Sequence, residues 1–135
     1  MPESDPDAPA YDLVQRDAHV DVVLLGRPRL GTVVALFAEL ERLTTREGEL
    51  LVLIDESEIH AEAVGHTELR NMLGAWLESD GLRNRSRIAI YAPSDLLNGL
   101  TRMAQMFGGG PADDRLVVFR NRRAARNWLL GRHAS

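Results

Sequence analysis

The chain has 135 residues, which fits one domain with a core large enough to be stable without cross-links. It contains no cysteine, which excludes a disulfide framework and a thiol nucleophile. The formal net charge is -4 and all 16 basic residues are arginine, so the overall charge does not favour nucleic acid and lysine chemistry is excluded.

The first ten residues contain three prolines and three acids with almost nothing to bury, which predicts a disordered acidic tail over 1–10. The remainder reads as one domain over 11–131 and a short tail over 132–135. Acids stand where a signal peptide would carry positive charge and an apolar core, and no apolar run reaches the roughly 18 residues that span a bilayer. We therefore expect a cytoplasmic protein without membrane insertion.

Two short β-prone runs, 11–17 and 20–25, open the domain and predict a hairpin or two adjacent strands. Thr32 is the predicted N-cap of the first helix, and Gly48 is its predicted end. Apolar residues at helical spacing mark the buried face of this helix: Val33, Leu36, Phe37, Leu40 and Leu43.

A continuous aliphatic strand over 50–54 ends at Asp55, and a polar loop follows over 56–65. Thr67 is the predicted N-cap of a second helix, which we expect to end at Asp80-Gly81. The apolar stripe of that helix consists of Leu69, Met72, Leu73, Trp76 and Leu77.

A buried strand over 88–92 then feeds a third helix that reaches Phe107, and Ser94 is its predicted N-cap. The run 108–110 is three glycines; it closes a helix instead of opening one, so it indicates a C-cap and loop, not a phosphate cradle. A strand over 116–119 and a helix capped by Asn121 complete the domain. We expect four residues of this last helix to face inward: Ala124, Ala125, Trp128 and Leu129.

The order β-β-α-β-α-β-α-β-α predicts an α/β fold. Three successive strand-helix-strand steps indicate right-handed crossovers within one sheet, and the opening pair supplies an antiparallel edge. We therefore expect a mixed, mostly parallel sheet of four or five strands with about four helices.

The runs A-P-S-D-L-L-N-G-L-T-R-M-A-Q-M-F, over 92–107, and R-L-V-V-F-R-N-R-R-A-A-R-N-W-L, over 115–129, carry a family resemblance. With the two-strand start and the alternating body, the chain resembles the SpoIIAA-like branch of the STAS domain superfamily over 11–130. The resemblance implies a sheet of four or five strands with helices packed on it, and a module that often binds a partner protein.

Anti-sigma-factor antagonists of that superfamily carry a phosphorylatable serine at the start of the helix after the third strand. The comparable stretch of this chain is G-H-T-E-L, over 65–69, where His66 stands at the serine position and Thr67 beside it. The resemblance makes Thr67 the phosphosite candidate. Capping alone also explains a threonine there, and we favour that interpretation.

The segment 55–66 is the richest in polar residues, and it follows a buried strand where ligands of open α/β sheets usually bind. Asp55, Ser57, His60 and His66 are its candidate binding residues. The spacing of the two histidines does not place both on one helical face, so a solvated loop is favoured over a metal site. Histidine near a carboxylate permits acid-base chemistry, but no nucleophile or cofactor motif accompanies it, so we expect no enzyme and no cofactor.

Further candidates lie on the helix that starts at Ser94. Asp95 complements the positive end of its dipole, and Asn98 and Arg102, at i and i+4, are predicted to be exposed or to contact a partner. Met106 lies beside the apolar stripe and widens it toward a groove or a homodimer contact.

Four arginines cluster around the last helix. They form either a solvated face whose positive charge the acidic tail partly balances, or a contact for an acidic partner or phosphate. The cluster comprises Arg120, Arg122, Arg123 and Arg126.

The sequence thus predicts a non-enzymatic module that binds another protein through the 55–66 loop and the helix start at Ser94. The alternative is a protein that binds a small apolar or anionic ligand in a pocket at the carboxyl ends of the strands. Nucleic acid is not expected, because the chain is acidic and the arginine cluster has no aromatic residue on its face.

Overall fold

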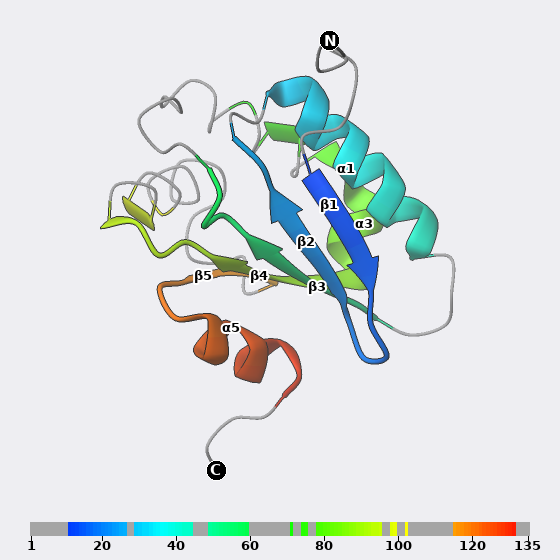
Figure 1. Cartoon of the computed structure of the whole chain (residues 1–135). Coiled ribbons are helices and arrows are strands. Elements are labelled where there is room, and N and C mark those ends of the chain that lie inside the picture. The colour runs from blue at the N-terminus through cyan, green and yellow to red at the C-terminus, as the bar shows by residue number, and fades with distance from the viewer. Residues whose placement is uncertain are drawn as a thin grey trace, which may run out of the picture.

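The computed structural model describes residues 11–26, 29–44, 49–59, 78–95 and 115–131, together with 71, 74, 75, 98, 99 and 102. One five-stranded sheet forms the centre of the molecule, and helices lie on both of its faces (Figure 1). Its elements are β1 (Tyr11–Gln15), β2 (Val20–Leu24), α1 (Leu30–Leu43), β3 (Leu50–Asp55), α3 (Asp80–Arg85), β4 (Ser86–Tyr91), β5 (Leu116–Phe119) and α5 (Arg122–Leu129).

The strands lie side by side in their order along the chain, β1-β2-β3-β4-β5. β1 and β2 are antiparallel, whereas every later pair is parallel. This confirms the predicted mixed, mostly parallel sheet with an antiparallel edge. A four-residue connection, 16–19, joins β1 to β2, and within it the Arg16 amide donates to the His19 carbonyl at 2.7 Å.

The strand order explains why the two faces of the sheet differ. When successive parallel strands are added in one direction, right-handed crossovers all fall on the same face. α1 and α3, which precede β3 and β4, pack together on that face, whereas α5 follows the last strand and packs on the opposite face (Figure 1).

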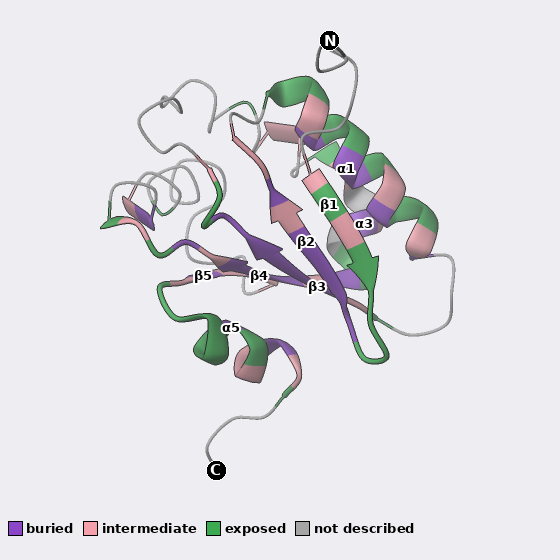
Figure 2. Ribbon diagram, in the orientation of Figure 1, coloured by how far each residue is buried: buried purple, intermediate pink, exposed green. Residues whose placement is uncertain are grey.

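The main core lies between the sheet and the α1–α3 pair (Figure 2). Leu36, Leu40 and Leu82 are fully buried there against alternate residues of the strands. A smaller core on the opposite face joins α5 to the centre of the sheet; it contains Leu53, Ala89, Ala125 and Leu129. Successive side chains along a strand therefore pack alternately into the two apolar cores, as the aliphatic composition of β3 predicts.

The edge strand β1 is tied to α1 through Tyr11, whose hydroxyl donates to Glu39 Oε1 at 2.6 Å. Burial, this hydrogen bond and the charge of Glu39 raise the pKa of Tyr11 to about 12. The bond holds the first strand against the helix layer at the edge of the sheet.

The boundaries of α1 differ from the prediction. The helix begins at Leu30, so Thr32 is a helical residue, and the N-cap position is held by Arg29 without a side-chain cap. It ends at Leu43, ahead of Gly48, because the amide and hydroxyl of Thr44 both donate to the Glu41 carbonyl, at 3.1 and 2.6 Å. Local hydrogen bonding, not glycine, therefore ends the helix.

A second difference is α3, which begins where the sequence predicted a helix to end. Asp80-Gly81 starts a short helix because Leu82 is fully buried against α1 and the sheet. A Cβ at Gly81 would lie 2.7 Å from Glu41 Oε1, so the exposed end of the Glu41 side chain lies directly over this glycine. The predicted end of the preceding helix agrees with the structure, because residue 78 is helical and residue 79 is not, whereas α3 itself was not predicted.

Two predicted helices lie mostly outside the described residues. Within the one expected to run from Thr67 to residue 79, residues 71, 74, 75 and 78 are helical, and within the one after Ser94, residues 95, 98, 99 and 102 are helical. The count of about four helices stays a prediction, as do the glycine loop at 108–110 and the proposed role of Met106. Among the described residues, no helix is long and apolar enough to cross a membrane.

The core makes a direct prediction for Leu40, which is fully buried in α1. We expect Leu40→Ala to lower the free energy of unfolding by about 2–5 kcal/mol, since it removes buried methyl groups and leaves a cavity. Urea denaturation followed by circular dichroism measures the change. Val34, which is 50% exposed on the same helix, provides the control: Val34→Ala should cost less than about 0.5 kcal/mol. Equal losses in both variants would contradict this core.

Candidate functional site

The carboxyl ends of β3, β4 and β5 lie in register at one edge of the sheet. Asp55 is paired with Tyr91, and Tyr91 with Phe119, so the segments that follow these residues are neighbours. This carboxyl edge is the place where open α/β folds usually bind ligands. Four of the predicted site residues come together there: Asp55, Ser57, Ser94 and Asp95.

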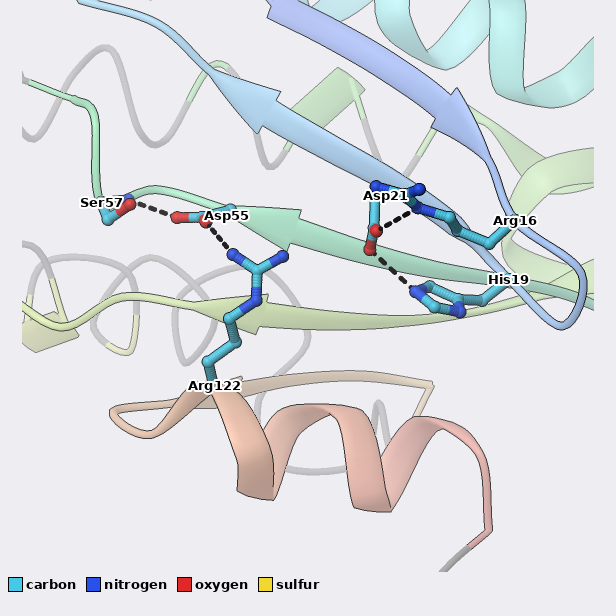
Figure 3. A network of polar contacts seen from close by, with 6 residues as sticks. All are labelled: Arg16, His19, Asp21, Asp55, Ser57 and Arg122. Carbon is cyan, nitrogen blue, oxygen red and sulfur yellow. Dashed lines mark hydrogen bonds and ion pairs between the residues drawn. The ribbon is translucent and has the colours of Figure 1, made fainter.

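Asp55 is the buried carboxylate at this edge, and only 5% of the residue is exposed. Its Oδ1 accepts a hydrogen bond from the Ser57 amide at 2.8 Å, and its Oδ2 accepts one from Arg122 Nη1 at 2.5 Å (Figure 3). The first bond shapes the turn after β3, and the second anchors the start of α5. Asp55 therefore lies beneath the surface, whereas Ser57 lies exposed upon it.

The loop after β3 is also held to the end of β2. The Gly26 amide donates to the Glu58 carbonyl at 3.0 Å, and Gly26 forms an isolated parallel bridge with Ile59. Gly26 has a φ of 61°, a left-handed conformation that glycine adopts without strain. Residues 56–59 are thus fixed on two sides and present Ser57 and Glu58 outward.

The N-cap of α5 is the residue that the sequence predicts. The Asn121 side chain accepts from the Ala124 amide at 3.0 Å, which confirms Asn121 as the N-cap. Ala125 and Leu129 are buried and Trp128 is half-buried, as expected, but Ala124 is exposed. Ala124 was predicted to face inward and does not, because the buried stripe of this short helix is narrower than the alanine pair suggests.

The arginine cluster is partly neutralised by carboxylates of the fold. Arg122 pairs with Asp55, and Arg120 pairs with Asp95 at the start of the segment after β4. These two ion pairs link α5 and its entry to the ends of β3 and β4. Neither partner comes from the acidic tail, which lies outside the described residues.

Asn98 is buried, with 1% exposed, so its predicted exposure is wrong. Its amide nitrogen donates to the Ala92 carbonyl at 3.3 Å, and its backbone amide donates to the Ser94 carbonyl at 2.8 Å. The Asn98 side chain therefore points back toward the end of β4 and not toward solvent. Arg102, one turn later, is exposed as predicted.

A second polar cluster, which the sequence analysis missed, lies on β2 beside the first. Asp21 is opposite Leu53 of β3 and so projects to the α5 face. Its Oδ1 is 2.8 Å from His19 Nε2, and its Oδ2 accepts from Arg16 Nε at 3.0 Å (Figure 3). A single aspartate inside the apolar strand V-D-V-V-L was the signal, because a buried acid requires partners.

Burial raises the pKa of Asp21, but opposing effects are larger in sum. Hydrogen bonds from Arg16 and His19, and the charges of His19 and Arg122, hold this pKa below its ordinary value of 3.8. The carboxylate therefore stays ionised at neutral pH. Arg122 thus stabilises negative charge on two neighbouring strands, through direct contact with Asp55 and through its field at Asp21.

Three predicted site residues, His60, His66 and Thr67, lie outside the described residues. The proposals for acid-base chemistry and for a phosphosite on that segment therefore stay predictions. Within the described ranges, no three histidine, aspartate or glutamate side chains are grouped so that they could hold a metal ion.

Comparisons of the chain with protein families, with curated proteins and with solved structures found no match. What the structure defines is a small α/β domain with a mixed five-stranded sheet. Its candidate site is the carboxyl edge, a polar surface supported by the Asp55–Arg122 pair.

The ion pair at this edge predicts a specific cost for losing Arg122. In Arg122→Ala, a buried carboxylate keeps the Ser57 amide but loses its charged donor, so we expect the free energy of unfolding to fall by about 1–3 kcal/mol. Urea denaturation at pH 7 measures the change. The control, Arg123→Ala, removes an exposed arginine from the same helix and should change stability by less than about 0.5 kcal/mol. Indistinguishable variants would show that the pair does not anchor α5.

The lowered pKa of Asp21 predicts a pH dependence of stability. Well above pH 3.8 the carboxylate is ionised in the folded and in the unfolded protein, so its full contribution to stability is present. As the pH falls below 3.8, the unfolded chain takes up the proton first, and the contribution to stability is lost. Unfolding free energies measured from pH 5 down to pH 2 should therefore fall less steeply in Asp21→Asn than in the wild type. Asp12→Asn, at an exposed position of β1, should keep the wild-type slope. A wild-type slope in Asp21→Asn would contradict the assignment.

Proposed function

We propose that the protein is a non-enzymatic, STAS-like interaction module that binds another protein through the carboxyl edge of its sheet. The proposal takes its family from the sequence resemblance, with which a sheet of five strands agrees. It takes its contact surface from the predicted residues that meet at this edge.

The observation that carries the proposal is the state of Asp55. Both of its carboxylate oxygens have partners, the Ser57 amide and Arg122, so the carboxylate acts as an internal support of the edge. Outward, the described part of the edge presents exposed polar groups on fixed backbone: Ser57, Glu58, Asp95 and Arg120. Firmly held polar loops at the end of a rigid sheet suit recognition of a partner.

The regulatory part of the proposal concerns Thr67, which the STAS resemblance makes the phosphosite candidate. The loop that leads toward it begins at the same edge, after Ile59. A phosphate on Thr67 would add negative charge to the module, which would weaken the binding of an acidic partner or favour the binding of a basic one.

The test is capture of a partner by the tagged full-length chain from its own cells, read by native mass spectrometry. Ser57→Arg/Glu58→Arg reverses the charge of the edge, and we expect it to lower partner occupancy about tenfold, since a loss of about 1.4 kcal/mol weakens binding by that factor. The matched control, Ala38→Arg/Glu41→Arg, makes the same changes at exposed positions of α1 and should retain the partner.

Three outcomes would decide the matter. A protein lost only from the edge variant supports the module. Equal retention by both variants contradicts the edge as the contact surface. A small molecule that is bound by the wild type and lost from the edge variant, with no protein bound, would favour the ligand-binding alternative.

A further inference from the structure

The segment from Arg115 to Gly131 carries five arginines and no acidic residue. Three of these arginines form ion pairs with carboxylates elsewhere in the fold: Arg115 with Glu49, Arg120 with Asp95, and Arg122 with Asp55. A sixth arginine, Arg87 of β4, lies 4.4 Å from the centre of the Trp128 ring beneath α5. The positive charge of this region is therefore only partly balanced within the fold.

Arg123 and Arg126 are the arginines left over. Both are exposed on α5, and at i and i+3 they are neighbours on its surface. Among the residues that the structure describes, no carboxylate forms an ion pair with either of them. The Arg122 side chain, which is 48% exposed beside its bond to Asp55, lies one turn before Arg126. We call Arg122, Arg123 and Arg126 the α5 arginine face.

We propose that the α5 arginine face binds an acidic segment of a partner protein. Guanidinium groups pair with carboxylates through two parallel hydrogen bonds, and neighbouring arginines on a helix match successive carboxylates of an extended chain. The face is held rigidly, because Ala125 and Leu129 are buried against the sheet, Asn121 caps the helix and Asp55 anchors its first residue.

The side chains of the face favour this partner over a nucleic acid. The face has no aromatic side chain on which bases could stack: Trp128 is half-buried between Arg87 and Phe119. A carboxylate needs only the guanidinium groups, whereas binding of a single-stranded nucleic acid commonly adds base stacking to its phosphate contacts.

This face adjoins the contact surface proposed above, because Arg122 pairs with Asp55 of the carboxyl edge. The test therefore changes only Arg123 and Arg126, which the proposed contact surface does not include, so the inference can fail without the proposed function. It adds a second contact of defined chemistry on the opposite side of the sheet from α1.

The test uses the full-length protein and a fluorescein-labelled peptide of ten glutamates, with binding read by fluorescence anisotropy at low salt. We expect Arg123→Glu/Arg126→Glu to weaken binding at least about tenfold, since two attractive contacts become repulsive. The matched control, Arg29→Glu/Arg85→Glu, makes the same charge change at exposed positions beside α1 and at the end of α3, and should stay within about twofold of the wild type. Circular dichroism checks that both variants are folded.

Other outcomes overturn the proposal. If both variants lose affinity equally, the peptide senses only net charge. If neither loses affinity, the peptide binds elsewhere. If a labelled ten-nucleotide RNA binds the wild type more tightly than the peptide and loses affinity in the α5 variant, the face recognises a polyphosphate and the assigned partner is wrong.

Discussion

The arrangement of the carboxyl edge depends on one buried carboxylate. Asp55 ends the central strand, and charge at that depth is tolerated only with partners. One oxygen takes the Ser57 amide, which sets the loop after β3, and the other takes Arg122, which positions the start of α5. The same guanidinium lowers the pKa of Asp21 on β2. This one charge pair therefore fixes the position of a loop and a helix, and its guanidinium stabilises carboxylates on two strands.

The two faces of the sheet have different roles for a topological reason. Strand order that advances in one direction sends the crossovers to one face, where α1 and α3 form the main apolar core. α5, the helix after the last strand, is free to cover the other face, with a smaller apolar contact and a margin of polar groups. The larger apolar core and the smaller core with its polar margin are therefore on opposite sides of one sheet.

Two surfaces of different chemistry follow from this division. The carboxyl edge presents Ser57, Glu58 and Asp95 on loops tied down by hydrogen bonds, and we propose that a partner protein binds there. The outer side of α5 presents Arg123 and Arg126, whose charge the described fold leaves unbalanced. On both proposals, charge contributes more to the contacts of this protein than apolar area does.

The strands, the order of strands and helices along the chain and the Asn121 cap could be predicted from the sequence, because each depends on residues close together in the chain. Hydrophobic alternation is local, and a cap bonds an amide three residues away. The predicted start of α1 at Thr32 was wrong, since the helix begins at Leu30 without a side-chain cap. The short helix α3 was not predicted, because the burial of Leu82 against α1 is a tertiary contact. Which residues form elements was thus largely a local matter.

Only the tertiary structure decided which polar groups meet. Asp55 and Arg122 are 67 residues apart, and Asp95 and Arg120 are 25 apart, so no spacing in the sequence joins them. Asn98 was predicted to be exposed from its helical position, but it is buried, and its side chain donates to the carbonyl of Ala92, the residue after β4. The sequence by itself determined the elements and their order, whereas the partners of each buried charge follow from the sheet register and from α5 packing back across it.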